Sequence, residues 1–302
     1  MTKILVVGTG AVGGFYAAKL AQADAEVSVL CRSDYEIVKK NGIKIKSLWG
    51  DFHFTPKNVL QNSHDYREKA DFILVATKAL PEISLASLLV PVLHPQVSII
   101  LIQNGIFIEK PVAEAFPDNH LISAIAFIDA VRKASGLIEH AGDGKLTIAD
   151  FVNSNPRKTE KLISLWQKVG VPCDFVSDIQ KERWKKLLWN AAFNPISVLA
   201  GCLNTQEILN NIFLKNLVRS AMKEVALLAK VEGYEISDEL IEEKIITTHE
   251  RKNPAKTSML IDFEAKRKME VEAILGNAIR FAEEKNILTP TLKSFYALLS
   301  NR

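Results

Sequence analysis

Cysteine is scarce in this chain of 302 residues. Its three cysteines, Cys31, Cys173 and Cys202, lie far apart and form no C-x-x-C pair. An odd number of dispersed cysteines indicates neither a zinc knuckle nor a disulfide framework. We therefore expect no metal site, and a reducing, cytoplasmic location.

Charge of one sign and long apolar runs are also missing. The 38 lysines and arginines nearly balance 35 aspartates and glutamates, and the net charge of +3 is too small for the basic footprint that duplex nucleic acid requires. No run approaches the ~20 apolar residues that cross a bilayer. The N-terminal run ILVVG is shorter than the apolar region of a signal peptide. We expect a globular protein with neither nucleic acid nor membrane as a partner.

The first half of the chain alternates between apolar strands and helices. Buried strands are predicted at residues 4–8, 26–31, 72–77 and 97–105, and helical segments at 14–23, 81–93 and 109–116. Continuous apolar strands separated by helices predict a parallel sheet covered on both faces. Residues 121–132, 136–142 and 145–151 predict three further strands joined by short turns, as an antiparallel or mixed extension of the same sheet.

From Ile179 onward almost every segment has helical periodicity. Helices are predicted at residues 180–194, 214–233 and 237–251, followed by a long helical run from about 257 to 285. The sequence therefore predicts an α/β Rossmann-type N-terminal domain, residues 1–177, and an all-α C-terminal domain, residues 178–302.

A glycine-rich turn follows the first predicted strand. Residues 8–13, GTGAVG, match G-x-G-x-x-G directly before a predicted helix, the context that makes this motif informative. The first glycine permits the tight turn, the second lets the backbone approach a pyrophosphate, and the third allows close packing of helix on strand. The helix N-terminus favours the phosphate charge. A dinucleotide is the predicted ligand, and a turn without a ligand is the alternative.

The second predicted strand ends at Arg32, where an acid would bind the ribose 2′-hydroxyl of NAD. A guanidinium attracts the 2′-phosphate of NADP instead. Arg32 lies 19 residues after Gly13, and Ser33 adds a hydroxyl donor. The residues favour NADP over NAD, with the alternative that Arg32 is a solvated cation and Asp34 binds the ribose.

Two more strand ends carry polar residues. Lys78 follows residues 72–77, and Gln103, Asn104 and Gly105 close the strand at 97–105. Because ligands of open α/β sheets bind outside the carboxyl ends of the strands, these residues are expected to face the cofactor. Turn formation is the alternative, since Asn-Gly is a common turn dipeptide.

A polar stripe runs along the apolar helix predicted at residues 180–194. Lys186, Asn190 and Asn194 recur at i, i+4 and i+8, which places them on one face. A buried amide without a partner costs about 1–3 kcal/mol, so the asparagines either join a structural network or line a site for a polar ligand. A lysine beside a nicotinamide would protonate the oxygen of a carbonyl under reduction. Pro195 is expected to bend or end the helix.

Several motifs together resemble the ketopantoate reductase (2-dehydropantoate 2-reductase) family over nearly the whole chain. They are GTGAVG at 8–13, Arg32, TKA at 77–79, QNG at 103–105 with Glu109, W-x-K-L-x-x-N-x-x-x-N-P at 184–195, and TSML-x-D at 257–262 followed by Glu270 and Gly276. The resemblance implies a Rossmann domain, a helical C-terminal domain of the 6-phosphogluconate dehydrogenase type, and an active site in the cleft between them. It also implies NADPH-dependent reduction of 2-dehydropantoate to (R)-pantoate, a step towards pantothenate and coenzyme A.

The resemblance also assigns roles to residues. Lys186 would donate the proton, and Asn104 would touch both cofactor and substrate. The other substrate contacts would be Asn190, Asn194, Asn204 and Ser258. The other cofactor contacts would be Gly8, Thr9, Gly10, Ala11, Val12, Gly13, Arg32, Lys78, Ala130 and Glu270. Asn204 is equally well placed to cap the helix that follows it.

One departure from the family pattern is Ala255, three residues before Ser258, where the family often has an asparagine. The small-molecule substrate is therefore 2-dehydropantoate or, as an alternative, another branched 2-oxo acid. A non-catalytic NADP(H) sensor is a further alternative, although it would need only the motifs of the first domain and not the stripe from Lys186 to Asn194. The long C-terminal helical run allows a homodimer.

Overall fold

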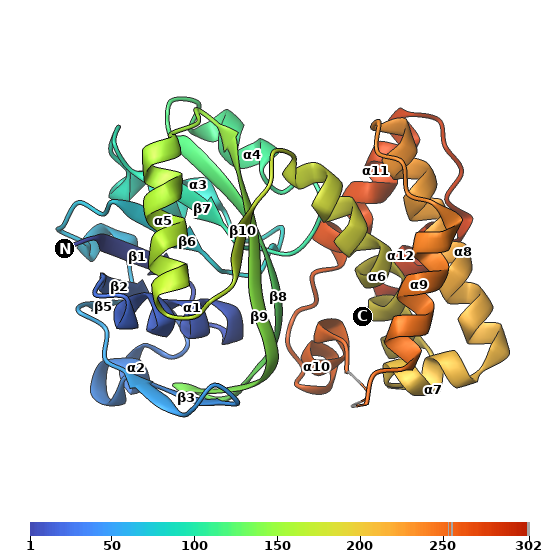
Figure 1. The fold of residues 1–302 in the computed structure, drawn as a ribbon, viewed down its shortest axis with the longest axis horizontal. Coiled ribbons are helices and arrows are strands. Elements are labelled where there is room, and N and C mark those ends of the chain that lie inside the picture. The colour runs from blue at the N-terminus through green and yellow to red at the C-terminus, as the bar shows by residue number, and fades with distance from the viewer. Residues whose placement is uncertain (253, 255, 301–302) are drawn as a thin grey trace. The chain divides into compact units, whose positions relative to one another are not determined.

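The computed structural model describes residues 1–252, 254 and 256–300, and this part of the chain forms two compact units (Figure 1). The first comprises Met1–Lys78, Ile83–Gln103 and Glu109–Ile179. The second comprises Ala79–Glu82, Asn104–Ile108 and the chain from Gln180 onward. Two short segments of the first half thus belong to the helical unit. The contiguous domains expected from the sequence, 1–177 and 178–302, stay a prediction.

The first unit is built on one sheet of ten strands in its described residues. The strands are β1 (Lys3–Val7), β2 (Glu26–Leu30), β3 (Ile43–Ser47), β4 (Phe52–Phe54), β5 (Val59–Leu60), β6 (Phe72–Val75), β7 (Ser98–Leu101), β8 (His120–Ala134), β9 (Leu137–Val152) and β10 (Cys173–Phe175). Their order is β4-β3-β9-β8-β7-β6-β1-β2-β5, and β10 pairs with β9. The pairs from β8 through β7, β6 and β1 to β2 are parallel, and β8 pairs with β9 antiparallel. The predicted parallel sheet with a mixed extension is confirmed.

The helices of the first unit connect these strands. They are α1 (Ala11–Gln22), α2 (Tyr35–Asn41), α3 (Leu85–Leu89), α4 (Lys110–Ala115) and α5 (Pro156–Lys168), with short 3-10 turns η1 (Ser63–Asp65) and η2 (Val90–Val92). Phe15, Tyr16 and Leu20 of α1 are fully buried against the sheet, in one core with Trp166 of α5. Strand order reverses at β1, between β2 and β6, which places the end of β1 at the switch point where such sheets bind ligands.

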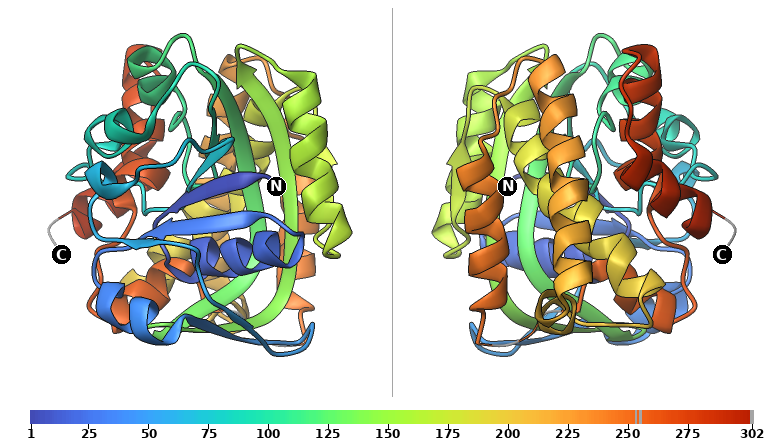
Figure 2. Two further views of the ribbon diagram at one scale, coloured as in Figure 1. Left: turned by 90° about the vertical axis from the view of Figure 1, so that its left-hand side faces the viewer. Right: turned by 90° about the vertical axis from the view of Figure 1, so that its right-hand side faces the viewer.

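The two long strands β8 and β9 differ from the prediction, because residues 136–142 and 145–151 form one strand and not two. Figure 2 shows both strands in green as strongly curved ribbons. The turn signal Asp143-Gly144 is a β-bulge: both residues have positive φ, and the register skips Gly144, since Phe127 pairs with Lys145 and Ile128 with Asp143. A bulge bends a strand without ending it, which accounts for the continuous curve.

The second unit is helical. Its elements are α6 (Ile179–Leu199), α7 (Thr205–Asn210), α8 (Ile212–Val231), α9 (Asp238–His249), α10 (Ser258–Glu264), the π-helix η3 (Glu272–Gly276), α11 (Asn277–Glu284) and α12 (Pro290–Leu299). Pro195 was expected to bend or end the helix; α6 runs four residues past it, so the proline does not end the helix, and the bend stays a prediction. Ile196 and Val198 are buried in the core of the unit, and their packing holds the last turn despite the missing donor.

The long helical run predicted from residue 257 to 285 is also wrong, because the chain leaves the helix after Glu264. Lys266 takes a left-handed conformation, φ 52°, and donates its N–H to the carbonyl of Phe263. The N–H of Arg267 bonds to the carbonyl of Asp262 at 2.8 Å, which completes a Schellman motif. No glycine marks this stop, so residue pattern alone did not reveal it.

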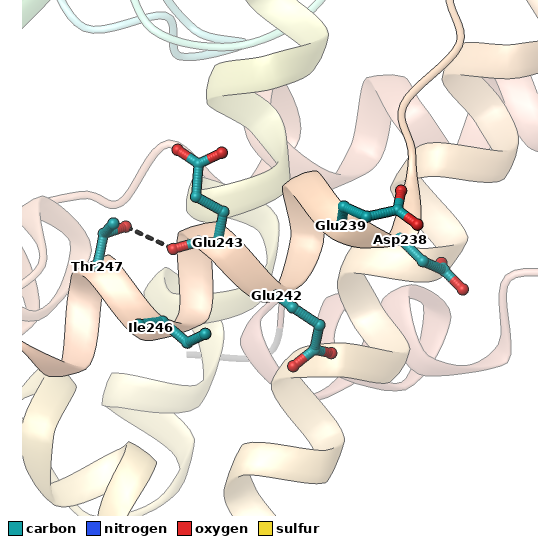
Figure 3. A pocket seen from close by; sticks show the side chains of 6 residues that line it. All are labelled: Asp238, Glu239, Glu242, Glu243, Ile246 and Thr247. Carbon is teal, nitrogen blue, oxygen red and sulfur yellow. Dashed lines mark hydrogen bonds between the residues drawn. The ribbon is translucent and has the colours of Figure 1, made fainter.

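Helix α9 carries an acidic surface. Asp238, Glu239, Glu242 and Glu243 line a shallow surface hollow together with Ile246 and Thr247 (Figure 3). Asp238 and Glu239 lie in the first turn, where negative charge is favoured by the helix dipole, and Glu242 pairs with Arg219.

The described residues contain no group of three or more His, Cys, Asp or Glu suited to a metal ion. No described helix combines the length and apolarity that a membrane crossing needs.

Candidate active site

The glycine-rich turn of the first unit is shaped for a close backbone approach. Gly8 has φ 97°, and a Cβ on it would lie 2.8 Å from the backbone nitrogen of Thr77. A Cβ on Gly13 would lie 2.0 Å from the carbonyl oxygen of Gly8, whereas a Cβ on Gly10 would meet nothing within 4 Å. Gly10 therefore faces open space at the start of α1, whose first turn contains no acidic residue. Residues 8–13, with Thr9 buried and Ala11 and Val12 half-buried, fit a dinucleotide pyrophosphate.

Replacing Gly13 or Gly10 by alanine is expected to have different effects: one variant should lose stability, and the other should lose dinucleotide binding. Gly13→Ala should lower the free energy of unfolding by about 1–3 kcal/mol or more, because the new Cβ overlaps the Gly8 carbonyl. Gly10→Ala is the matched control: it should leave stability nearly unchanged but weaken dinucleotide binding, since the methyl fills the open space. Urea denaturation measures stability, and titration with a reduced nicotinamide dinucleotide, followed by its fluorescence, measures binding. Equal loss of stability in both variants would contradict this description.

The end of β2 places Arg32 in solvent. Among the residues that the structure describes, its guanidinium forms no ion pair or hydrogen bond. Asp34, two residues on, is 3% exposed. Its carboxylate already accepts hydrogen bonds from Ser33, Arg132 and Ser135. Arg32 is therefore the more accessible of the two residues that the sequence offered for the ribose.

The other expected cofactor contacts of the first unit lie on β8 and after β6. Lys78 is half-buried directly after Thr77. The Gln103 amide donates to the Thr77 carbonyl at 2.8 Å and to the Thr77 hydroxyl at 3.1 Å, so it ties the ends of β6 and β7 together. Ala130 is half-buried on β8 opposite His140, two residues before Arg132.

In the helical unit, three predicted site residues form a row. The Lys186 ammonium on α6 donates to Asn104 Oδ1 at 2.8 Å. The Asn104 amide nitrogen lies 3.5 Å from Glu270 Oε2, and Glu270 Oε1 accepts the backbone N–H of Ala79 at 2.9 Å. Glu270 is only 9% exposed. Three residues that are distant in sequence thus form one row in space, in which the amide of Asn104 lies between the ammonium of Lys186 and the carboxylate of Glu270.

The surroundings of Lys186 weaken its hold on the proton. Burial lowers the pKa of Lys186 to about 7, the nearby Arg183 guanidinium acts in the same direction, and the Glu270 carboxylate opposes both. Arg183 is 3% exposed and donates to the carbonyl of Gly105 at 3.1 Å. A group with a pKa near the working pH transfers protons efficiently. Sequence reasoning missed Arg183, although its position three residues before Lys186 was a signal.

The π-helix η3 holds the segment that carries Asn104. The carbonyl of Ala273 accepts the N–H of Ile106 at 3.0 Å, and the Asn277 amide donates to the carbonyl of Ile106 at 2.7 Å. Gly105 has φ 113°, and a Cβ there would lie 2.6 Å from the Ala273 carbonyl oxygen. Single π-turns frequently occur at functional sites. Here the turn pins the Asn-Gly segment so that Asn104 meets Lys186.

Asn194 is completely buried, and neither polar atom of its side chain has a partner in the described residues. Asn190, one turn earlier, is 8% exposed. Ser197 donates to the carbonyl of Asn194 at 2.7 Å and lies 2.6 Å from the hydroxyl of Thr257, the N-cap of α10. A polar ligand bound here would supply the hydrogen bonds that the side-chain amide of Asn194 lacks.

The remaining predicted contacts are placed differently. Ser258 is exposed at the first position of α10. Asn204 caps α7: its Oδ1 accepts the N–H groups of Gln206 and Glu207 at 2.9 and 3.0 Å, which is the alternative weighed from the sequence. Only its amide nitrogen is left for a substrate. The departure at Ala255 lies outside the described residues.

Comparison with known proteins gives matches over nearly the whole chain. The family described as "Ketopantoate reductase PanE/ApbA" matches residues 4–153, and "Ketopantoate reductase PanE/ApbA C terminal" matches residues 178–302. A 2-dehydropantoate 2-reductase of Nostoc sp. is 33% identical, with 97% of this chain and 93% of that protein covered. A crystal structure of 2-dehydropantoate 2-reductase from Methylococcus capsulatus is 40% identical with a TM-score of 0.90, covering 99% and 96% of the two chains.

A more distant structure shares the fold. D-mandelate dehydrogenase, in its ternary structure with NADH and anilino(oxo)acetate, is 19% identical with a TM-score of 0.90. The match covers 99% of this chain and 98% of that one. At this identity the likeness extends to the fold alone. The prediction of a Rossmann-type unit with an all-α unit is confirmed by these matches together.

Proposed function

Because the chain belongs to the ketopantoate reductase family, and is therefore a pyridine-nucleotide-dependent oxidoreductase, we propose that it reduces 2-dehydropantoate to (R)-pantoate with NADPH. The observation that carries the proposal is the row Lys186, Asn104 and Glu270 in the helical unit. The unpartnered amide of Asn194 on the same helix as Lys186 supports it. The predicted homodimer and cytoplasmic location stay predictions.

The residues of the first unit that would hold the cofactor are the glycine-rich turn and Arg32. The turn offers open space at Gly10 and the N-terminus of α1 for the pyrophosphate. Arg32, exposed and unpaired within the described chain, would bind the 2′-phosphate of NADPH. Lys78, Ala130, Asn104 and Glu270 would add further contacts. When bound, NADPH supplies a hydride to the substrate carbonyl carbon.

Lys186 would supply the proton. As the carbonyl oxygen gains negative charge, the ammonium stabilises it and then transfers a proton to it. Asn104 holds Lys186 in place through its side-chain oxygen, and Glu270 holds Asn104. Asn190, Asn194 and Ser258 would orient the carboxylate and hydroxyl of the substrate, with Asn204 contributing its free amide nitrogen.

The activity test is the loss of NADPH absorbance with 2-dehydropantoate, run beside a panel of other 2-oxo acids and repeated with NADH. Preference for 2-dehydropantoate and NADPH is the expected result. Turnover on another branched 2-oxo acid alone would change the assigned substrate but leave the proposed role of Lys186 intact. Tight NADPH binding without turnover on any oxo acid would contradict the proposal.

The reductive reaction should lose activity as the pH rises through neutrality. The pKa of Lys186 is lowered to about 7, so the ammonium that donates the proton is present below that pH and is lost above it. We expect kcat/KM to fall about tenfold per pH unit on the alkaline side. Arg183→Met should move this fall to higher pH, because it removes a positive charge that lowers the pKa of Lys186. Lys185→Met, which removes a half-exposed charge paired with Glu182, is the control and should leave the profile unchanged.

A further inference from the structure

Asp34 lies two residues past Arg32, near the place where an NAD-binding protein would use an acid. It follows β2 by four residues, close to the distance from the glycine-rich turn at which a carboxylate binds the ribose 2′-hydroxyl of NAD. An open carboxylate at this place would bind NADH and repel the 2′-phosphate of NADPH. It would therefore oppose the cofactor choice that Arg32 favours.

The structure closes this carboxylate. Its side chain is 4% exposed, and one oxygen, Oδ1, receives three donors. The Ser33 hydroxyl lies at 3.1 Å, the Ser135 hydroxyl at 3.2 Å, and the Arg132 guanidinium forms an ion pair with the same oxygen. A buried carboxylate is stable only when it is paired and hydrogen-bonded, and Arg132 supplies the opposite charge.

Strand β8 brings Arg132 to this position from 98 residues away in sequence. Beyond its pairing with β7, β8 continues along β9, and Arg132 pairs with Ile138. The ladder shifts register between Asp129 and Ala130 and again between Arg132 and Ala134. Such bulges re-aim side chains. The neighbour Lys133 pairs with Glu139 instead, so only Arg132 meets Asp34 on this part of the strand.

We propose that Arg132 is a specificity-determining residue for the cofactor. By pairing with Asp34 it prevents this carboxylate from binding the 2′-hydroxyl of NADH and from repelling the 2′-phosphate of NADPH, which leaves Arg32 to bind that phosphate. The inference rests on the proposed NADPH preference and adds a second residue to it. Arg132 is partly exposed, with 28% of its side chain accessible, and it acts through Asp34.

The test measures binding of two cofactor fragments, 2′,5′-ADP and 5′-AMP, by calorimetry, so it does not depend on turnover. Arg132→Gln should lower the preference for 2′,5′-ADP about tenfold or more, the change expected when a charge-assisted interaction is replaced by an unpaired charge. The double variant Arg132→Gln with Asp34→Asn should restore most of the preference, because the exposed negative charge is gone. Lys133→Gln is the matched control and should bind both fragments like the unchanged protein.

Two outcomes would overturn the inference. An unchanged preference in Arg132→Gln would mean that Asp34 does not act on the cofactor. Failure of the double variant to restore the preference would mean that Arg132 contacts the phosphate itself and does not act by masking. If Arg132→Gln does not fold, the single variant Asp34→Asn tests the inference. Because Arg132 already masks the Asp34 charge, this variant should change the preference for 2′,5′-ADP over 5′-AMP little. A rise of about tenfold in that preference would show that the carboxylate is open and would overturn the inference.

A separate variant distinguishes this inference from the proposed NADPH preference. Arg32→Gln should remove most of the preference for 2′,5′-ADP if Arg32 binds the 2′-phosphate. If Arg32→Gln and Arg132→Gln both leave binding unchanged, the proposed cofactor choice fails. If only Arg132→Gln has no effect, the cofactor choice stands and the masking of Asp34 fails.

Discussion

Lys186→Ala is expected to lower kcat/KM for the reduction by about 10²–10⁴-fold, the contribution typical of a positioned general acid. In the proposed mechanism, this variant loses both the proton and the positive charge that Lys186 supplies at the carbonyl oxygen. NADPH binding should change little, because the glycine-rich turn and Arg32 belong to the other unit. Stopped-flow kinetics with saturating NADPH and NADPH fluorescence titration measure the two quantities separately.

Lys185→Ala is the control for this variant. Lys185 lies next to Lys186 on α6, but its ammonium pairs with Glu182 at 2.7 Å at the surface. Its loss should leave kcat/KM nearly unchanged, because exposed ion pairs contribute little. If Lys186→Ala retained nearly full turnover, or if Lys185→Ala lost as much, Lys186 would not be the proton donor. Added primary amines should partly rescue Lys186→Ala and not the control.

Asn194→Leu is expected to make the protein more stable and nearly inactive. Both polar atoms of this fully buried side chain lack partners within the described chain, and each unsatisfied group costs about 1–3 kcal/mol. A leucine has the same branching and the same number of side-chain heavy atoms, with bulkier methyl groups in place of the polar atoms; it removes this cost but offers nothing to a polar substrate. We expect a higher urea midpoint together with a loss of about 10²-fold or more in kcat/KM, since a site built for a polar group discriminates strongly when the pairing is lost.

Ser197→Ala provides the contrast on the same helix. Ser197 is also completely buried, but its hydroxyl is bonded to the Asn194 carbonyl and to Thr257. Its removal leaves Thr257 without this partner and should lower the free energy of unfolding by about 1–3 kcal/mol. If Asn194→Leu were destabilising to the same degree as Ser197→Ala, Asn194 would be a structural residue and its assignment to the substrate would be wrong.

Local features of the fold were predictable because they are encoded over a few residues. Gly13 is needed for its close approach to the carbonyl of Gly8, five residues earlier within the turn, and the apolar strands around the turn are continuous in sequence. The stripe of Lys186, Asn190 and Asn194 likewise follows from helical geometry alone. Their joint appearance also carried the family resemblance.

Features that depend on distant partners were not predictable in this way. The helix stop at Lys266 was missed because its positive φ occurs at a lysine and not at a glycine. Conversely, the turn predicted at Asp143-Gly144 is a bulge within one continuous strand, β9. Pro195 is tolerated because of packing against the rest of the helical unit. The placement of Arg183 and the pairing of Arg132 with Asp34 join elements that no short sequence window contains.

Two segments of the first half of the chain, Ala79–Glu82 and Asn104–Ile108, belong to the helical unit, and this limits where the chain can be recombined with another protein. A helical unit transplanted at residue 179 onto a foreign nucleotide-binding domain would bring Lys186 and Glu270 with it. It would leave behind Asn104, which lies between them, and the Ala79 N–H that Glu270 accepts. The row of Lys186, Asn104 and Glu270, which we propose to be catalytic, is thus complete only with both halves of the chain, and recombination at residue 179 would produce a chimera that lacks one of its three members.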